Sequence, residues 1–346
     1  MRAARFHGAG DIRVEDIPDL PAPGSGEVQV KVEWCGICGT DMHEYSEGPI
    51  LVPPALASVT LGHEFSGQIV ATGDEVSSLT AGDWVTASSL LHCGACFHCL
   101  RHQPSVCSNL SILGLSRDGA LAEYLNVPAW ACVRIPEGLS PEEAALAEPA
   151  AGAVRALRKG RVQVGETVAV VGLGAIGLMA VRAARLVGAA RVIAVGRGDF
   201  RKETAGLLGA DAVLDPGDPS FLERFAALTD GRGADVVVEL AGSHDSLELA
   251  CELTCNQGRT VLMGVFGRPV SVNATRIVTG EKELIGSCGF IYDEEFAATV
   301  NMMADGRLQL APLITSRIKL DEVIELGFRR IHEDKRPHLR VLVSPR

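Results

Sequence analysis

The chain has 346 residues, enough for two domains, because a single hydrophobic core stops growing at about 250–300 residues. Its 43 acidic residues outnumber its 32 basic ones, which argues against nucleic acid as a partner. No apolar run is long enough to span a membrane, and the segment MRAARFHGAG lacks the apolar core of a signal peptide. We therefore expect a cytoplasmic protein.

The first predicted element that bears on function is a strand at residues 27–35. Valines occupy alternate positions of EVQVKVEWC, and a period of two indicates a strand with one buried face. The segment GICGTDMHEY follows, and in it Gly36 and Gly39 flank Cys38. Because glycine lets the backbone bend tightly, the chain can turn here around a bound ion.

A second candidate ligand lies in TLGHEFSGQIVATG, which we predict to be a strand. A thiolate and an imidazole suit Zn²⁺, and a catalytic zinc typically has three protein ligands and one open position. We therefore interpret Cys38 and His63 as ligands of a catalytic zinc, although the pair alone is also compatible with a buried thiol and a core histidine. Glu64 is an outer ligand, a hydrogen-bond partner or half of a structural ion pair.

Thr40 and His43 follow Cys38 closely and predict a proton path. Oxidation of a buried alcohol releases a proton, and a hydroxyl followed by an imidazole can carry it to solvent. Asp41, between them, is suited to accept the free N–H of His63. The alternative is that these side chains only cap the start of a helix.

The strongest local motif is CGACFHCLRHQPSVC at residues 93–107, with the spacing Cys-x2-Cys-x2-Cys-x7-Cys. Four thiolates at this spacing can close a tetrahedron around one Zn²⁺ and leave no open position, so we predict a structural zinc lobe. The motif alone also permits an iron–sulfur cluster or a disulfide pair. The predicted ligands are Cys93, Cys96, Cys99 and Cys107.

A helix is predicted to begin at Ser140, because SPEEAAL combines an N-cap serine, a proline in the first turn and Glu143 at the third position. Glu148 falls on this helix, just before Pro149. An unpaired carboxylate in an apolar helical segment is costly to bury. A bound metal would remove that cost, whereas a partly exposed helix acid is the alternative.

From residue 165 the pattern changes to strands that alternate with helices. VAVVGLGAIG follows a buried strand and precedes an apolar helix, which is the context that a dinucleotide-binding G-x-G-x-x-G turn requires. The free N–H groups of the helix N-terminus can hold a pyrophosphate. We expect cofactor contacts from Gly172, Gly174, Ala175, Ile176 and Gly177.

The end of the next strand, VIAVGRGDFRK, decides which dinucleotide binds. An acid at this position would bond to the ribose hydroxyls of NAD, but the chain has Gly196 followed by Arg197. Without the acid a 2′-phosphate is not repelled, and Arg197 can pair with it, assisted by Arg201 or Lys202. We therefore predict a preference for NADP; in the alternative, Asp199 serves NAD and Arg197 faces water.

Further strand and helix patterns continue to residue 285, and the chain then ends in a helix and a terminal strand, LRVLV. We therefore predict an α/β protein. A doubly wound parallel-sheet domain, residues 151–285, is inserted into a β-rich domain formed by residues 1–150 and 286–346.

Together these motifs resemble those of the zinc-containing medium-chain dehydrogenases/reductases, the alcohol dehydrogenase superfamily. The resemblance covers nearly the whole chain, with GICGTDMHEY, GHEFSG, the four-cysteine lobe, DGALAEY, AEP and VVGLGAIG in the family's order. It implies a GroES-like catalytic domain and a Rossmann cofactor domain, assembled as homodimers or homotetramers. It also implies that Cys38 and His63 bind a catalytic zinc and that Thr40 and His43 relay protons.

The resemblance also bears on the third ligand and the substrate. Glu148 occupies a ligand position that is a cysteine in many alcohol dehydrogenases and a glutamate in the polyol, butanediol and threonine dehydrogenase branch, in which Glu64 can also approach the metal. HEYSEGPILVPP resembles the butanediol type most. Gly289 and Phe290 stand in place of an Arg-Tyr pair that serves polyol hydroxyls, so a small or apolar alcohol is favoured over a long polyol.

We therefore predict a zinc-dependent oxidoreductase that transfers a hydride between a secondary alcohol or ketone and NADP(H). The alternatives are an NAD-dependent polyol or threonine-type dehydrogenase, and a zinc- and nucleotide-binding protein that has lost catalysis. The intact relay of Thr40 and His43 argues against such a loss. The Cys38 and His63 pair argues against a zinc-free quinone reductase of the same fold.

Overall fold

The computed structural model describes residues 1–56, 58–334 and 336–346. The chain separates into two units, one formed by Met1–Pro149 with Ile291–Arg346 and the other by Ala150–Phe290. Each unit contains its own main β-sheet, and both ends of the chain belong to the first unit.

The first unit is built mostly of antiparallel strands. Its seven-stranded sheet has the order β10 (Cys132–Arg134), β6 (Trp84–Ala87), β5 (Glu64–Thr72), β3 (Glu27–Gly36), β18 (Arg340–Ser344) and β17 (Ile314–Lys319), with β9 (Tyr124–Pro128) also paired to β3. A second sheet has the order β2 (Asp11–Asp16), β1 (Arg2–Gly8) and β4 (Val59–Thr60), and β7 (Leu90–Leu91) pairs with β8 (Ser111–Ile112).

The predicted strand at residues 27–35 is β3, and its alternating valines lie in the core of this unit. Backbone pairing along its edges joins β3 to β5, β9 and β18, so β3 is a central strand of the sheet. At its end, Gly36 is opposite Glu64 of β5 and Leu342 of β18. Three segments that are far apart in the sequence therefore meet at the point where the chain enters Cys38.

The α-helices of this unit are α1 (Gly39–Glu47), α2 (Pro141–Ala144), the start of α3 (Ala147–Lys159), α9 (Ala297–Ala304) and α10 (Arg330–Glu333). The last two directly continue the π-helical segments Tyr292–Phe296 and Val323–Arg329. We predicted one helix from Ser140, and the structure instead has two, with Ser140 capping α2 and a new helix beginning at Ala147. Pro149 has no N–H to donate and is tolerated only in a first turn. The restart therefore puts Glu148 at a helix N-terminus.

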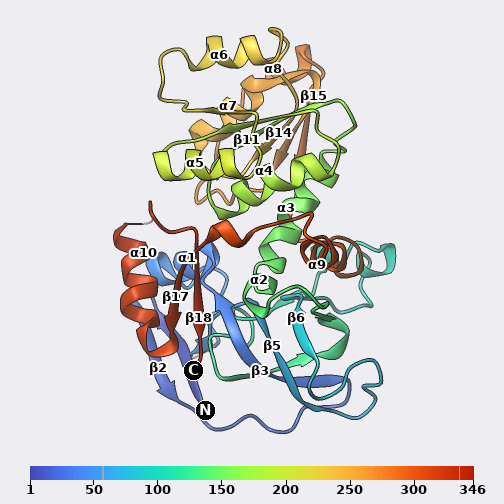
Figure 1. Cartoon of the computed structure of the whole chain (residues 1–346), viewed down its shortest axis with the longest axis vertical. Coiled ribbons are helices and arrows are strands. Elements are labelled where there is room, and N and C mark those ends of the chain that lie inside the picture. The colour runs from blue at the N-terminus through green and yellow to red at the C-terminus, as the bar shows by residue number, and fades with distance from the viewer. Residues whose placement is uncertain (57, 335) are drawn as a thin grey trace. The chain divides into compact units, whose positions relative to one another are not determined.

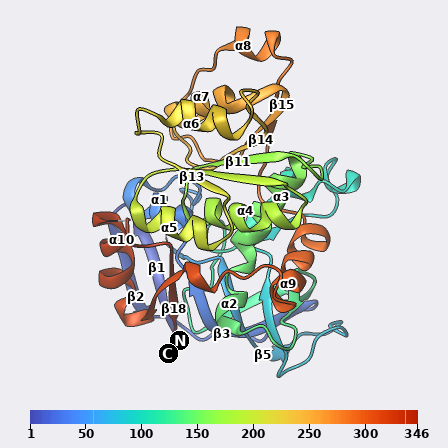
Figure 2. The ribbon, with the colours of Figure 1, turned by 45° about the horizontal axis from the view of Figure 1, so that its top comes forward.

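The second unit is built around one fully parallel six-stranded sheet. Its order is β13 (Ala212–Leu214), β12 (Arg191–Val195), β11 (Thr167–Val171), β14 (Ala234–Glu239), β15 (Thr254–Leu262) and β16 (Glu283–Gly286). The helices of this unit are α4 (Ala175–Leu186), α5 (Asp199–Leu207), α6 (Phe221–Leu228), α7 (His244–Leu253) and α8 (Ala274–Thr279). Figure 1 and Figure 2 show α4 and α5 on one side of the sheet and α6 and α7 on the other. The strand order reverses between β11 and β14, which is the switch point where doubly wound folds bind ligands.

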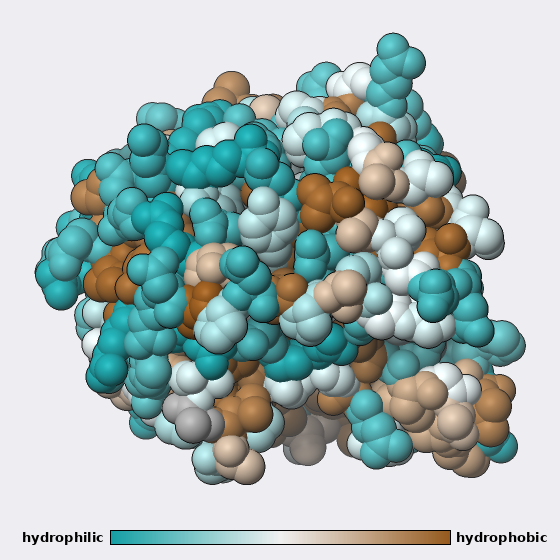
Figure 3. All heavy atoms as spheres, turned by 90° about the horizontal axis from the view of Figure 1, so that it is seen from below, coloured by the Kyte–Doolittle hydropathy of each residue, from teal (hydrophilic) through white to brown (hydrophobic). Residues whose placement is uncertain are grey.

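The face of the molecule seen in Figure 3 is largely hydrophilic. In Figure 3, hydrophilic residues cover much of the visible face, and the hydrophobic ones occur in small groups among them. Within the described residues, no helix combines the length and apolar character that crossing a membrane requires.

Candidate metal and dinucleotide sites

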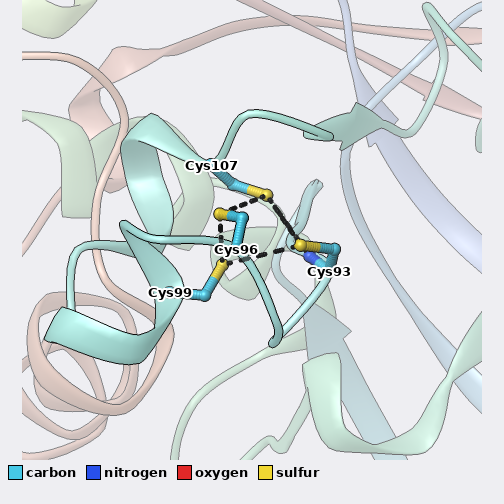
Figure 4. Close-up of side chains that lie close together, drawn as sticks. All are labelled: Cys93, Cys96, Cys99 and Cys107. Carbon is cyan, nitrogen blue, oxygen red and sulfur yellow. Dashed lines mark hydrogen bonds between the residues drawn. The ribbon is translucent and has the colours of Figure 1, made fainter.

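The four cysteines of the predicted lobe converge on one point (Figure 4). Neighbouring sulfur atoms are 3.5 to 4.0 Å apart around the group. A tetrahedron with Zn–S distances of about 2.3 Å has sulfur–sulfur edges of about 3.8 Å, so the sulfurs already outline the coordination shell of one ion. All four are free cysteines, and their separations far exceed a disulfide bond of about 2.05 Å. The enclosed space suits one ion and excludes a multi-iron cluster.

The backbone of the lobe supports thiolates. The amide N–H groups of Cys93 and Asn109 donate to the Cys107 sulfur at 3.4 and 3.3 Å. Backbone N–H groups of Cys99 and Ser108 lower the pKa of Cys96 to about 5, whereas removal from water and the neighbouring sulfurs raise the pKa of Cys99 to about 12. Because the thiolate is the form that binds a metal, these local bonds prepare the site for a cation.

The second cluster contains Cys38, His63 and Glu64, whose ligand atoms all lie within 4.8 Å of one another. Cys38 is the residue before α1, while His63 and Glu64 lie at the start of β5. The pairing of β3 with β5 brings these two places together. All three side chains are buried, and burial together with the Glu64 charge raises the pKa of the Cys38 thiol. A bound cation would stabilise the ionised form of this cysteine.

The Asp41 carboxylate faces the Nδ1 atom of the His63 ring. Its Oδ1 lies 3.6 Å from His63 Nδ1, and Nδ1 has no hydrogen-bond partner among the described residues. Burial opposes a charge on the imidazole, but Asp41 and Cys38 raise the pKa of His63 well above its usual value. A carboxylate facing the outer nitrogen of a histidine is typical of metal sites, where it orients the ring.

Asp41 also caps the helix, which is the alternative role considered for it, whereas its contact with His63 is an ion-pair distance of 3.6 Å and not a hydrogen bond. Its Oδ2 accepts a hydrogen bond of 2.9 Å from the Cys38 backbone N–H, which fixes the start of α1. Thr40 Oγ1 lies 3.7 Å from Cys38 Sγ, next to the metal ligands. His43 is exposed and lies one helical turn further along α1. A hydroxyl beside the site and an imidazole at the surface thus follow each other on one helix.

Glu64 forms an ion pair, one of the three roles considered for it. Nη1 of Arg340 lies 2.7 Å from Oε1 and 2.6 Å from Oε2, and the two side chains are 3% and 0% exposed. The sequence offered no signal for Arg340, because it is 276 residues from Glu64 in the chain.

Glu148 lies outside the three-residue cluster but near it. Removal from water, and after it the Glu64 charge, raises the pKa of Glu148 to about 7, against the opposing effect of His63. Its Oε1 accepts a hydrogen bond of 2.5 Å from the Ser89 hydroxyl. Two acids thus stand beside Cys38 and His63, and sequence reasoning missed the side chain that bonds to each of them.

The glycine-rich turn of the second unit has the predicted geometry. Gly172 has φ of +102°, and a Cβ at Gly177 would lie 1.8 Å from the Gly172 carbonyl oxygen. Gly174 is the N-cap of α4, which Ala175 and Ile176 begin. The first N–H groups of α4 have no partner within the helix, so they are available to an anion such as a pyrophosphate.

The end of β12 carries arginines and no acid. Gly196 follows β12, and Arg197 is exposed. Nη1 of Arg201 donates to the Leu173 carbonyl at 2.9 Å, which holds Arg201 against the glycine-rich turn. A 2′-phosphate bound beside Gly196 would meet positive charge.

Asp199, the residue considered for NAD, is bound elsewhere. Its carboxylate lies 3.0 Å from Lys202 Nζ, and its side chain is 91% exposed. Lys202 also contacts Asp215 at 3.4 Å. Lys202 is therefore neutralised by two acids and is a weaker candidate for a phosphate than the arginines.

Comparison with known proteins extends over the whole chain. Family models of an alcohol dehydrogenase GroES-like domain and of a zinc-binding dehydrogenase match residues 24–137 and 175–305. The (R,R)-butanediol dehydrogenase of Bacillus subtilis (strain 168) is 34% identical over 356 aligned positions, covering 100% of both chains. The L-threonine 3-dehydrogenase of Pyrococcus abyssi (strain GE5 / Orsay) is 33% identical and covers 97% of this chain and 95% of its own. The crystal structure of a zinc-binding dehydrogenase from Sinorhizobium meliloti 1021 bound to NADP matches with a TM-score of 0.91 and 33% identity, covering 99% of both chains.

Proposed function

Because the chain belongs to the zinc-binding alcohol dehydrogenase family of oxidoreductases, we propose that it interconverts a small secondary alcohol and its ketone with NADP(H). The observation that carries this proposal is the convergence of Cys38 and His63 in a buried cluster, with Asp41 behind the imidazole. The donor set of thiolate, imidazole and nearby carboxylates fits zinc.

In the proposed site, Cys38 and His63 hold the metal, and Glu148 supplies the third protein ligand. When bound, zinc acts as a Lewis acid on the substrate oxygen, and the nicotinamide exchanges the hydride. Asp41 orients His63. Glu64 is a weaker candidate than Glu148 for the third ligand, because its carboxylate already pairs with Arg340. Glu64 is the alternative third ligand, since it lies within the cluster.

Proton movement is assigned to the residues on α1. Thr40 Oγ1, beside the Cys38 sulfur, accepts the proton that the substrate hydroxyl releases and gives up its own hydroxyl proton toward His43. His43, exposed one turn later, takes it onward to solvent at an imidazole nitrogen. An imidazole suits this step because its ordinary pKa is near neutral pH.

The cofactor site is proposed at the glycine-rich turn and the end of β12. The N-terminus of α4 receives the pyrophosphate, and Arg197 and Arg201 receive the 2′-phosphate of NADP. The absence of an acid at Gly196 supports NADP over NAD, because a carboxylate there would repel the phosphate.

A small alcohol is the proposed substrate. The butanediol dehydrogenase relative supports a compact diol or hydroxyketone. The family resemblance implies that Gly289 and Phe290 stand in place of an Arg-Tyr pair that serves polyol hydroxyls, which supports a small alcohol over a long polyol. The threonine dehydrogenase relative supports a second candidate, an amino alcohol such as L-threonine.

The test is a turnover panel with purified protein of measured zinc content. Butanediol stereoisomers, simple secondary alcohols, L-threonine and sorbitol are each assayed with NADP⁺ and NAD⁺, beside Cys38→Ser protein as the control for background reduction. We expect two zinc ions per chain and the highest kcat/KM with a small diol or secondary alcohol and NADP⁺. Equal rates in wild-type and Cys38→Ser protein would contradict the zinc mechanism, and a higher kcat/KM with NAD⁺ would contradict the cofactor assignment.

A further inference from the structure

Ser89 lies between β6 and β7, and only 1% of it is exposed. Its hydroxyl lies 2.5 Å from Oε1 of Glu148 and donates to it, because an ionised carboxylate can only accept. A hydroxyl–carboxylate bond of this length is charge-assisted and roughly twice as strong as a neutral one. This bond ties the turn before β7 to the first turn of α3.

The two acids beside Cys38 and His63 differ in whether each of their carboxylate oxygens has a partner. Both oxygens of Glu64 are within hydrogen-bond distance of Arg340. Among the residues that the structure describes, Glu148 has no ion-pair partner, and its Oε2 accepts no hydrogen bond. Glu148 is half-buried, and a partly desolvated carboxylate without a counter-charge is costly, so a cation at the neighbouring cluster would remove the cost.

We propose that Ser89 is a positioning residue, which holds Glu148 by Oε1 so that Oε2 is presented to the metal bound by Cys38 and His63. The inference rests on the proposed function, because it requires a metal at that cluster. A side chain that hydrogen-bonds a metal ligand fixes the orientation of the ligand, and its loss typically costs 10–100-fold in metal affinity.

The neighbouring serine provides a matched control. Ser88 is equally buried, but within the described part of the chain its hydroxyl bonds only to the backbone of Leu90. Ser88→Ala therefore removes a buried hydroxyl from the same turn without touching Glu148. Ser89→Thr keeps a hydroxyl at the position and serves as the rescue variant, whereas Ser89→Ala removes it.

The experiment measures zinc affinity by competition with a chelator, together with the visible absorption of Co²⁺-substituted protein. The four-cysteine lobe gives an internal reference in both measurements, because its ligands are unchanged. In Ser89→Ala we expect the Kd of the Cys38–His63 site to rise about 10–100-fold. We also expect the Co²⁺ bands of that site to shift. Ser89→Thr should restore both signals, and Ser88→Ala should match the wild type.

The outcomes separate the inference from the proposed function. If the wild-type protein binds metal only at the four-cysteine lobe, the proposed function fails and the inference fails with it. If the wild type binds both ions and Ser89→Ala has the same affinity and Co²⁺ spectrum, the inference alone is wrong. Tighter binding in Ser89→Ala would also overturn it, since Ser89 would then hold Glu148 away from the metal.

Discussion

Replacement of Arg340 by methionine should destabilise the first unit more than any loss of a surface ion pair. Arg340 is 3% exposed, and it is the ion-pair partner of Glu64, which is fully buried. Methionine fills a similar volume but leaves the Glu64 carboxylate without its cation, next to the Cys38 thiol. A buried charge that loses its partner must be desolvated without compensation.

The expected cost follows from this burial. Removal of one partner of a buried ion pair costs about 3–5 kcal/mol of the free energy of unfolding. For domains of about 150–250 residues, 1 kcal/mol lowers Tm by about 2–4 °C, so the variant should melt about 6–20 °C below the wild type. In the double variant Arg340→Met with Glu64→Gln the lone charge is gone, and the loss should shrink to the cost of an unsatisfied buried amide, about 1–3 kcal/mol.

The assay is thermal and urea unfolding of protein with equal zinc content. The control is Arg317→Met, because Arg317 pairs with Glu142 at the surface, where an ion pair is worth about 0–1 kcal/mol. The reasoning is refuted if Arg340→Met and Arg317→Met melt at the same temperature. It is also refuted if the double variant is no more stable than Arg340→Met alone.

Four further variants, one of them with a control, test the sites separately. Cys38→Ser should lose the catalytic zinc and all turnover but still bind dinucleotide, whereas Cys93→Ser should lose the structural zinc and mainly lower Tm. Metal analysis and NADPH fluorescence titration would measure both effects. Loss of the same zinc ion in both variants would contradict the assignment. Gly177→Ala should abolish NADPH binding, because its Cβ would lie 1.8 Å from a backbone oxygen of the same turn, while Gly206→Ala, with open space around its Cβ, should bind normally. Arg197→Ala should lower kcat/KM for NADP⁺ about 10–100-fold, the worth of a charged hydrogen bond, and a parallel loss with NAD⁺ would exclude a phosphate contact.

The local motifs could be predicted from the sequence because short stretches of chain determine them. Cys93 and Cys107 are fourteen residues apart with two cysteines between them, so turns of the intervening chain suffice to gather the sulfurs. The glycine-rich turn is equally local, since Gly172 and Gly177 contact each other within one strand–helix connection. The helix break before Ala147 was missed, although Pro149 was a visible signal for it.

The roles of the two acids were decided only by the tertiary structure. Glu64 and Glu148 are both plausible ligands in the sequence, and nothing near them in the chain distinguishes them. The difference comes from Arg340, which reaches Glu64 because β18 pairs with β3, and from Ser89, which reaches Glu148 because the turn after β6 packs beside α3. Such contacts arise when distant segments bury their apolar faces together, and sequence periodicity indicates which face is buried but not what it will meet.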